Sequence, residues 1–382
     1  MQDSLAFIVI VLVVILLAAL VFFVTRRPER REDDAAADYA AGLNYLVSGD
    51  LNLALRKLKD AARKDTNNID AYIKIGDILR SMGHLDQAIK VHRDLTARSS
   101  LTPVQRLQIL RALVQDYEAR ERYDLALQMV QKILAIKKDD LWAKEKELQL
   151  LEASGEWEKA ADIYKKLSKL KDDFRKSRLA LYKVEQGKKV RQAGDEKQSR
   201  VHFREAIKID PKCAAAYLEL SDSYLRENRP QEAIRALEKF MAAAPEKADL
   251  AFSRAKELLF KIGEFGEIEN VYQEVIQRSP ENWAAYLALA EIKEKKGELD
   301  QAVNLCQQIL QKNPDYRPAR EYLIRYFHRS GKDQLAVEQA LALINTEQNA
   351  KLKYRCSRCG HVESEPFWRC PQCHQWETVE GV

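Results

Sequence analysis

The sequence predicts an all-α protein whose helix-turn-helix repeats form a superhelical solenoid, with one N-terminal transmembrane helix and a small C-terminal metal-binding unit. Three observations predict it. Sequence features recur every 34 residues, residues 5–24 carry no charge, and two Cys-x-x-Cys pairs stand near the C-terminus. Charged residues make up 32% of the 382 residues, with only 13 Gly and 10 Pro, as in a mostly helical chain. Six Cys are too few for a secreted disulfide scaffold, which excludes that class.

The uncharged run at the N-terminus is long enough to cross a membrane. It reads LAFIVIVLVVILLAALVFFV from Leu5 to Val24, and at about 1.5 Å per residue it spans about 30 Å. Only Met-Gln-Asp-Ser precedes it, without a positive segment, and no small-x-small cleavage site follows it. The run is therefore predicted to be a retained anchor rather than a cleaved signal peptide.

The charges beside this run predict its orientation. Four arginines follow it closely, whereas residues 1–4 contain no Lys or Arg. The positive-inside rule then leaves residues 1–4 outside and places the linker 25–34 and the body of the chain in the cytoplasm. A specific lipid-binding role is the alternative for these arginines, which are Arg26, Arg27, Arg30 and Arg31.

Residues 35–347 are predicted to form nine repeats. Gly42 and Gly49 recur 34 residues later as Gly76 and Gly83. A period of 34 is that of the tetratricopeptide repeat, in which two helices pack closely and a glycine in the left-handed conformation ends the first. Such an array offers a groove for peptides or protein segments and no catalytic constellation, so a non-enzymatic function is expected. Ten of the thirteen glycines follow the repeat: Gly49, Gly83, Gly155, Gly194, Gly263, Gly297 and Gly331 at the turn, and Gly42, Gly76 and Gly187 where the helices approach.

A basic stretch lies in the middle of the array. Between Lys165 and Lys208 there are fifteen Lys and Arg against six Asp and Glu. Lys188, Lys189 and Arg191 are the candidate docking surface, for an acidic protein or for anionic headgroups. The alternative is a solvated helix face. Nucleic acid is not expected as a partner, because no aromatic–basic stacking motif accompanies the charge.

The strongest local signal is a set of four cysteines in residues 353–376, before a tail at 377–382. Two C-x2-C pairs stand ten residues apart, and four thiolates at about 2.3 Å form a closed tetrahedral site for one metal ion. Disulfides are disfavoured in a cytosolic compartment, and either zinc or iron suits four sulfurs. His361 and His374 are expected to lie outside the ligand set. Cys213 and Cys306 are expected to be buried in the repeats. The predicted ligands are Cys356, Cys359, Cys370 and Cys373.

An anchor, nine repeats and a terminal four-cysteine unit occur in this order, and the Cys pairs read KYRCSRCG and WRCPQCHQW. This combination resembles the lipopolysaccharide assembly protein B family of Gram-negative bacteria. The resemblance implies an inner-membrane, single-pass regulator with a periplasmic N-terminus and a rubredoxin-like unit of four cysteines. Its implied partners are a membrane-anchored AAA+ protease, the deacetylase that commits material to lipid A, and proteins of lipopolysaccharide synthesis and export.

Three functions are therefore considered. The first is a membrane-tethered adaptor that regulates lipopolysaccharide synthesis. The second is an iron-dependent redox sensor or carrier, although ten residues between the Cys pairs are fewer than in a true rubredoxin. The third is a generic tetratricopeptide scaffold with no link to lipopolysaccharide.

Overall fold

The computed structural model describes residue 15 and residues 33–171, 173–344 and 354–381. These residues belong to two compact units, 1–170 and 171–382. The predicted span Leu5–Val24, apart from Ile15, lies outside the described residues, as do Arg26, Arg27, Arg30 and Arg31. Within the described ranges, no helix has both the length and the apolar character needed to cross a membrane.

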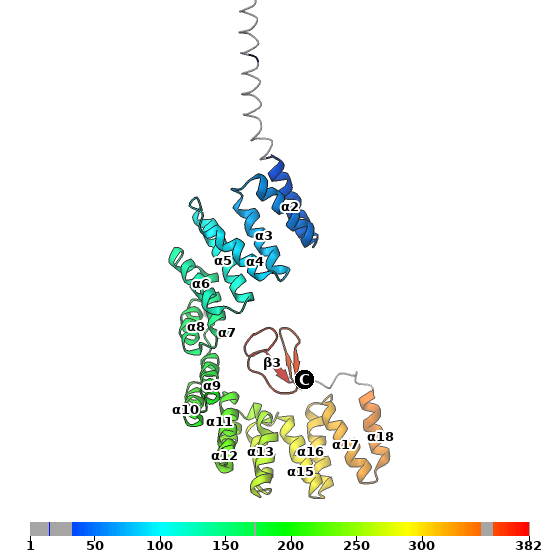
Figure 1. The fold of residues 1–382 in the computed structure, drawn as a ribbon. Helices are drawn as coiled ribbons and strands as arrows, with labels where there is room; N and C mark the ends of the chain where they lie inside the picture. Colours follow the sequence, from blue (N-terminus) through cyan, green and yellow to red (C-terminus); the bar gives the residue numbers. More distant parts are fainter. Residues whose placement is uncertain (1–14, 16–32, 172, 345–353, 382) are drawn as a thin grey trace, which may run out of the picture. The chain divides into compact units, whose positions relative to one another are not determined.

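The first unit consists of helices that follow one another in pairs (Figure 1). Residues 33–47 are helical and pair with the next helix, and the later helices pair in the same way. Their bounds are α2 (Leu51–Lys64), α3 (Ile69–Ser81), α4 (Leu85–Thr96), α5 (Pro103–Ala119), α6 (Tyr123–Ile136), α7 (Leu141–Ala153) and α8 (Trp157–Lys171).

The second unit continues the pattern and ends in a small sheet. Its helices are α9 (Lys176–Gln192), α10 (Glu196–Ile209), α11 (Ala214–Arg226), α12 (Pro230–Ala243), η1 (Pro245–Lys247), α13 (Asp249–Ile262), α14 (Glu267–Arg278), α15 (Trp283–Lys295), α16 (Leu299–Lys312), α17 (Arg317–Arg329) and α18 (Asp333–Ile344). Its strands are β1 (Tyr354–Cys356), β2 (Val362–Glu363) and β3 (Val379–Gly381).

The turn glycines have the conformation that the repeat predicts. All seven have φ between 70° and 92°, the left-handed region in which a residue without a Cβ is favoured. Two turns use another residue at the same position: Glu121 before α6 and Asn228 before α12, both with φ of 57°. The backbone conformation of the repeat is thus kept at these two turns, although the glycine is not.

The core is built from contacts between neighbouring helices along the array. The small residue early in the second helix of a pair is fully buried at Ala54, Ala88, Ala126 and Ala302. The helices of a pair also approach closely, since a Cβ on Gly42 would lie 2.7 Å from Leu58 Cγ. The fold is therefore a tetratricopeptide solenoid with a small C-terminal cysteine unit, as the sequence predicts.

The C-terminal unit contains a three-stranded antiparallel sheet in the order β2-β1-β3. Tyr354 pairs with Glu363 on one side and with Gly381 on the other. The prediction of a separate tail at 377–382 was therefore wrong for residues 379–381, which form the edge strand β3. Strands of two or three residues are too short to show a periodic pattern, so the sequence does not reveal them.

Candidate metal centre

The first cysteine pair lies on a tight turn that leaves strand β1. The backbone N–H of Cys356 donates to the carbonyl of His361 at 2.8 Å, and the N–H of Gly360 donates to the carbonyl of Cys356 at 2.9 Å. Gly360 has φ of 75°. This closed turn holds Cys356 and Cys359 on one side of the loop.

The second cysteine pair repeats the same turn. The N–H of Cys370 donates to the carbonyl of Gln375 at 2.8 Å, and the N–H of His374 donates to the carbonyl of Cys370 at 2.9 Å. His374 occupies the position of Gly360 in the first turn and has φ of 56°. An imidazole-bearing residue therefore takes a conformation that usually favours glycine.

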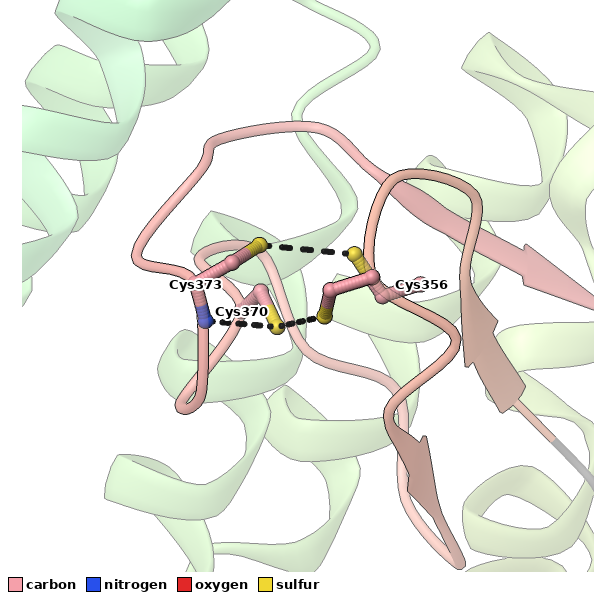
Figure 2. A group of neighbouring side chains, drawn as sticks. Cys356, Cys370 and Cys373 are labelled. Atoms are coloured by element: carbon pink, nitrogen blue, oxygen red, sulfur yellow. Dashed lines mark hydrogen bonds between the residues drawn. The ribbon is translucent and has the colours of Figure 1, made fainter. Parts of the chain in front are cut away.

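The two turns bring four sulfur atoms together. The Sγ atoms of Cys356, Cys359, Cys370 and Cys373 all lie within 4.8 Å of one another. Cys356 Sγ is 3.7 Å from Cys373 Sγ (Figure 2). Cys359 Sγ is 3.5 Å from Cys370 Sγ. A tetrahedral ion with metal–sulfur bonds of about 2.3 Å separates its ligands by about 3.8 Å. The spacing of the four sulfurs therefore fits one tetrahedral ion.

The electrostatics of the thiols also suit a cation. Burial raises the pKa of Cys356, but hydrogen bonding with Thr378 and with the N–H groups of Cys359 and Arg358 outweighs it and lowers the pKa to about 6. The N–H of His361 favours the Cys359 thiolate, yet burial and the neighbouring sulfurs raise the pKa of Cys359 to about 12. Four thiolates repel one another unless a cation lies between them, and a bound cation stabilises all four.

The two histidines beside the cysteine turns do not join the sulfurs. The group of candidate ligand atoms in the described residues consists of the four Sγ atoms alone. His361 Nε2 instead lies 3.0 Å from Glu363 Oε1. Thr378, which the sequence analysis did not identify, has its hydroxyl 3.1 Å from Cys356 Sγ. No sequence pattern predicts this contact, because Thr378 lies twenty-two residues after Cys356.

Aromatic and charged side chains attach the metal unit, residues 354–381, to the helical repeats of residues 171–344. The rings of Trp376 and Tyr182 meet edge to face, with centroids 5.4 Å apart. The guanidinium of Arg178 lies 5.9 Å from the centre of the Trp376 ring, and Arg175 pairs with Glu377 at 3.4 Å. Trp368 packs against the hydrophobic cores of the helices α9 to α13. Two aromatic side chains of the metal unit, Trp368 and Trp376, therefore form much of its contact with the solenoid.

A cavity of about 760 Å³ lies where the metal unit faces α9, α11 and α13. Tyr354, Phe367 and Trp368 line it from the metal unit. The helices contribute five carboxylates and two cations, Lys188 and Arg254, and burial raises the pKa of Asp222 and Asp249 among the carboxylates. The cavity therefore combines an aromatic wall with a charged wall in which carboxylates outnumber cations, and its shape depends on the folding of the metal unit.

The predicted basic triplet lies partly in ion pairs within the solenoid. Lys188 Nζ lies 2.8 Å from Glu185 Oε1, and the Arg191 guanidinium pairs with Glu219. Lys189 is exposed. Two of the three cations are thus partly neutralised by neighbouring carboxylates, so the docking surface predicted there stays a prediction.

The two remaining cysteines lie in the repeat cores. Both Cys213 and Cys306 are buried. Burial raises the pKa of each thiol to about 12. A neutral buried thiol behaves as a small apolar side chain, as the sequence predicts.

The first unit contains a buried polar cluster that the sequence analysis missed. His92 and Asp116 are fully buried, with Nδ1 and Oδ2 2.5 Å apart, and the other ring nitrogen of His92 lies 3.1 Å from the carbonyl oxygen of Ile73. Arg80 donates to the second oxygen of Asp116 at 2.8 Å. The signal available in the sequence was a histidine at a position where the other repeats have Leu, Val, Tyr or Phe.

Family models match both parts of the chain. A rubredoxin metal binding domain matches residues 354–380, and tetratricopeptide repeat models match residues 69–95, 190–258 and 259–325. Among solved structures, the chain is similar to the crystal structure of MamA at 22% identity and a TM-score of 0.31, over 42% of this chain and 92% of that one.

Curated relatives match the chain along most of its length. Lipopolysaccharide assembly protein B of Escherichia coli (strain K12) is 25% identical over 351 residues, which are 90% of this chain and 89% of that protein. The protein of the same name from Haemophilus influenzae is 24% identical over 360 residues, with the same coverage. The resemblance found in the sequence is thereby confirmed, since the chain is similar to proteins named lipopolysaccharide assembly protein B over nine-tenths of its length.

Proposed function

We propose that this chain is a non-enzymatic adaptor of lipopolysaccharide assembly, tethered to the inner membrane. The observation that carries the proposal is the attachment of a four-cysteine unit to a tetratricopeptide array through Trp376 and Tyr182. The attached unit forms one wall of an open cavity whose other wall is the solenoid. Such a cavity suits a protein segment held between a rigid array and a metal-stabilised cap.

We propose a structural role for the metal. The unit at residues 353–376, extended by β3, is too small to fold on a hydrophobic core alone. Bound through Cys356, Cys359, Cys370 and Cys373, a zinc or iron ion would supply the cross-link that stabilises both turns. Thr378 and the backbone N–H groups then hold the sulfurs in their charged form.

We propose that the segment Leu5–Val24 anchors the chain, with residues 1–4 in the periplasm and the solenoid in the cytoplasm. The arginines that follow the segment support this orientation. Anchoring raises the effective concentration of the solenoid near other membrane proteins. A reporter enzyme fused after Val382 should be active in the cytoplasm, and activity in the periplasm would overturn this topology.

The proposed clients follow from the family resemblance. The adaptor would present the lipid A-committing deacetylase to a membrane-anchored AAA+ protease and so couple lipopolysaccharide synthesis to export. The test is a pulse-chase of the deacetylase in cells that contain, lack or regain the full chain. We expect its half-life to lengthen when the chain is lost and to recover with the wild-type chain. An unchanged half-life in the depleted cells would overturn the proposal.

The rival redox function makes a different prediction for deacetylase degradation reconstituted from purified proteins. The protein is loaded with zinc or with iron, and metal content is verified before the deacetylase and the protease are added. A structural metal predicts equal adaptor activity for the two forms. Activity confined to the iron form, and dependent on its oxidation state, would replace the structural role with a redox sensor.

A further inference from the structure

A groove of about 600 Å³ runs along α5 in the first unit, between α4 and α6. Its floor is apolar and comes from buried side chains of α5 and α6, namely Ile109, Leu110, Leu113 and Met129. Ile136 lines one end of the groove and is 43% exposed. We call this feature the α5 groove. The six-residue connection 97–102, where the repeat spacing is longer than elsewhere in the first unit, lies at the same end.

Three cations line the α5 groove, one from each helix. They are Arg93 on α4, Arg106 on α5 and Lys132 on α6, and all three are exposed. Within the described part of the chain, none of the three side chains forms an ion pair, and no Asp or Glu lines the groove. Elsewhere in this unit, cations near carboxylates are paired, as in Arg111–Asp140 at 2.7 Å. The groove therefore has an unbalanced positive charge.

The charge lies at one end of the α5 groove. Consecutive helices joined by short turns run in opposite directions, so the C-terminal ends of α4 and α6 lie beside the N-terminal end of α5. Arg93, Arg106 and Lys132 all lie toward these ends. Tyr117 and Leu125 line the opposite end. The distance along α5 from Arg106 to Tyr117 is about 16 Å at about 1.5 Å per residue.

From this arrangement we infer that the α5 groove binds a single-chain amphiphile with an anionic head, such as a long-chain fatty acid. The carboxylate lies among Arg93, Arg106 and Lys132, and the chain lies on the apolar floor toward Tyr117. Guanidinium groups match a carboxylate in geometry as well as charge. A site of this volume with an apolar lining and few convergent polar groups is typical of small-molecule pockets.

The distribution of charge favours this ligand over an acidic amphipathic helix. A bound helix has carboxylates along its length and calls for cations along both walls of a groove. Here the three cations cluster at one end, and the rest of the lining is apolar apart from Thr96, Gln128 and the Tyr117 hydroxyl. One head and one apolar tail match this asymmetry.

The test uses the full chain in nanodiscs of neutral phosphatidylcholine and a palmitate analogue that carries a diazirine in its chain. After illumination and digestion, we expect crosslinks in peptides of α5 and α6. Excess palmitate should compete, and hexadecyltrimethylammonium, which has the same tail and a cationic head, should not. Absence of crosslinks in α5 and α6, or equal competition by the cation, would overturn the proposal.

Two kinds of variant test the geometry. Removing the three cations with R93Q, R106Q and K132Q should lower crosslinking at least tenfold at a fixed probe concentration, because the head loses its charged partners. The variant A135W should also lower it, because Ala135 is exposed and lines the groove, so a large side chain there fills the site. A matched variant with K59Q, R63Q and K138Q removes the same charge from exposed positions outside the groove, and its crosslinking should equal that of the wild type.

Equal crosslinking in all variants would overturn the inference, since it would place the probe elsewhere. A protein partner that is lost from native membranes in the cation and A135W variants, while fatty-acid crosslinking is unchanged, would assign the groove to an acidic protein segment instead. Circular dichroism of each variant verifies that the helices remain folded.

Discussion

Gly187 lies where α9 and α10 approach most closely. A Cβ at this position would lie 2.8 Å from Cδ1 of Phe203, and even closer to the next ring carbon, and Phe203 is fully buried. A buried ring cannot move aside without disturbing its neighbours. The glycine is therefore required by packing rather than by backbone conformation, as the sequence predicts for Gly42, Gly76 and Gly187.

We expect Gly187→Ala to lower the free energy of unfolding by about 1–3 kcal/mol, because overpacking a tight contact forces side chains and backbone apart. In a unit of about 200 residues this corresponds to a fall in Tm of about 2–4 °C per kcal/mol. Gly266→Ala is the control, because a Cβ there meets nothing within 4 Å and φ is −62°. Thermal melting should show a loss for the first variant and no loss for the second.

Both ring nitrogens of His92 face oxygen atoms that can accept hydrogen bonds, from Asp116 and from Ile73. Nε2 donates to the Ile73 carbonyl, and Nδ1 shares a hydrogen bond with the Asp116 carboxyl group. His92→Leu should cost about 1–3 kcal/mol, because the buried Asp116 loses one of its hydrogen-bond partners in the interior. The exposed His84, whose side chain caps no helix, provides the control His84→Leu, which should melt like the wild type. Equal melting of the two variants would contradict a stabilising role for this buried hydrogen bond.

At the scale of the element, we expect the two cysteine turns to depend on the proposed ion between them. Cys373→Ser removes one of the four converging sulfurs. Metal content should fall to background, and the strands β1–β3 should lose protection in hydrogen exchange, because metal binding and folding are coupled in so small a unit. The helices have their own cores, so the far-ultraviolet circular dichroism should change little. Retention of a full complement of metal would contradict the four-sulfur site.

Trp376→Ala tests the contact between the metal unit and α9 separately from the metal. The change removes the edge-to-face pair with Tyr182 and part of the buried apolar area. The contact should weaken by about 2 kcal/mol, while the metal content stays at the wild-type level. Hydrogen exchange in α9 should rise in this variant and remain low in Trp376→Phe. Loss of metal in Trp376→Ala would show that the indole stabilises the site itself.

The sequence predicts those parts of the fold that repeat. The glycines at the turns and at the close helix contacts recur with the repeat. The structure confirms the positive φ of the turn glycines and the tight packing around Gly42 and Gly187. Glu121 and Asn228 break the glycine pattern and still adopt positive φ, because the neighbouring repeats determine the turn. The convergence of the four cysteines was predictable for a similar reason, since C-x2-C fixes the local geometry of each pair.

Contacts between distant residues were not predictable from the sequence. Tyr182 and Trp376 are separated by nearly two hundred residues. Neither lies in a local sequence pattern that indicates a contact with the other. The pairing of Arg191 with Glu219 likewise depends on how α9 and α11 stack. These contacts depend on how the helices and the metal unit pack in three dimensions. The same packing determines which residues line the cavity beside the metal unit.

At the scale of the whole molecule, the proposed anchor and the folded units serve different purposes. Residues 35–382 contain all the described helices from α2 onward, most of the helix at 33–47 and the complete sheet. Among the described residues, each unit has its own buried clusters, which are built from the helices of the repeats. The fragment 35–382 should therefore keep the helix content, the metal content and the melting behaviour of the full chain.

The same fragment should nevertheless regulate poorly at native expression. A membrane tether confines the solenoid to the layer in which membrane partners lie. Effective concentrations set by such linkage reach millimolar levels, and the apparent affinity can exceed that of untethered binding by about 10²–10⁴-fold. Without the tether, the deacetylase half-life in cells should approach that of cells lacking the chain. Fusing the fragment to an unrelated single-pass anchor of the same orientation should restore degradation, because the tether supplies proximity rather than sequence-specific contacts. Full complementation by the untethered fragment would show that proximity to the membrane is dispensable, and failure of the unrelated anchor would show that residues 5–24 make contacts of their own.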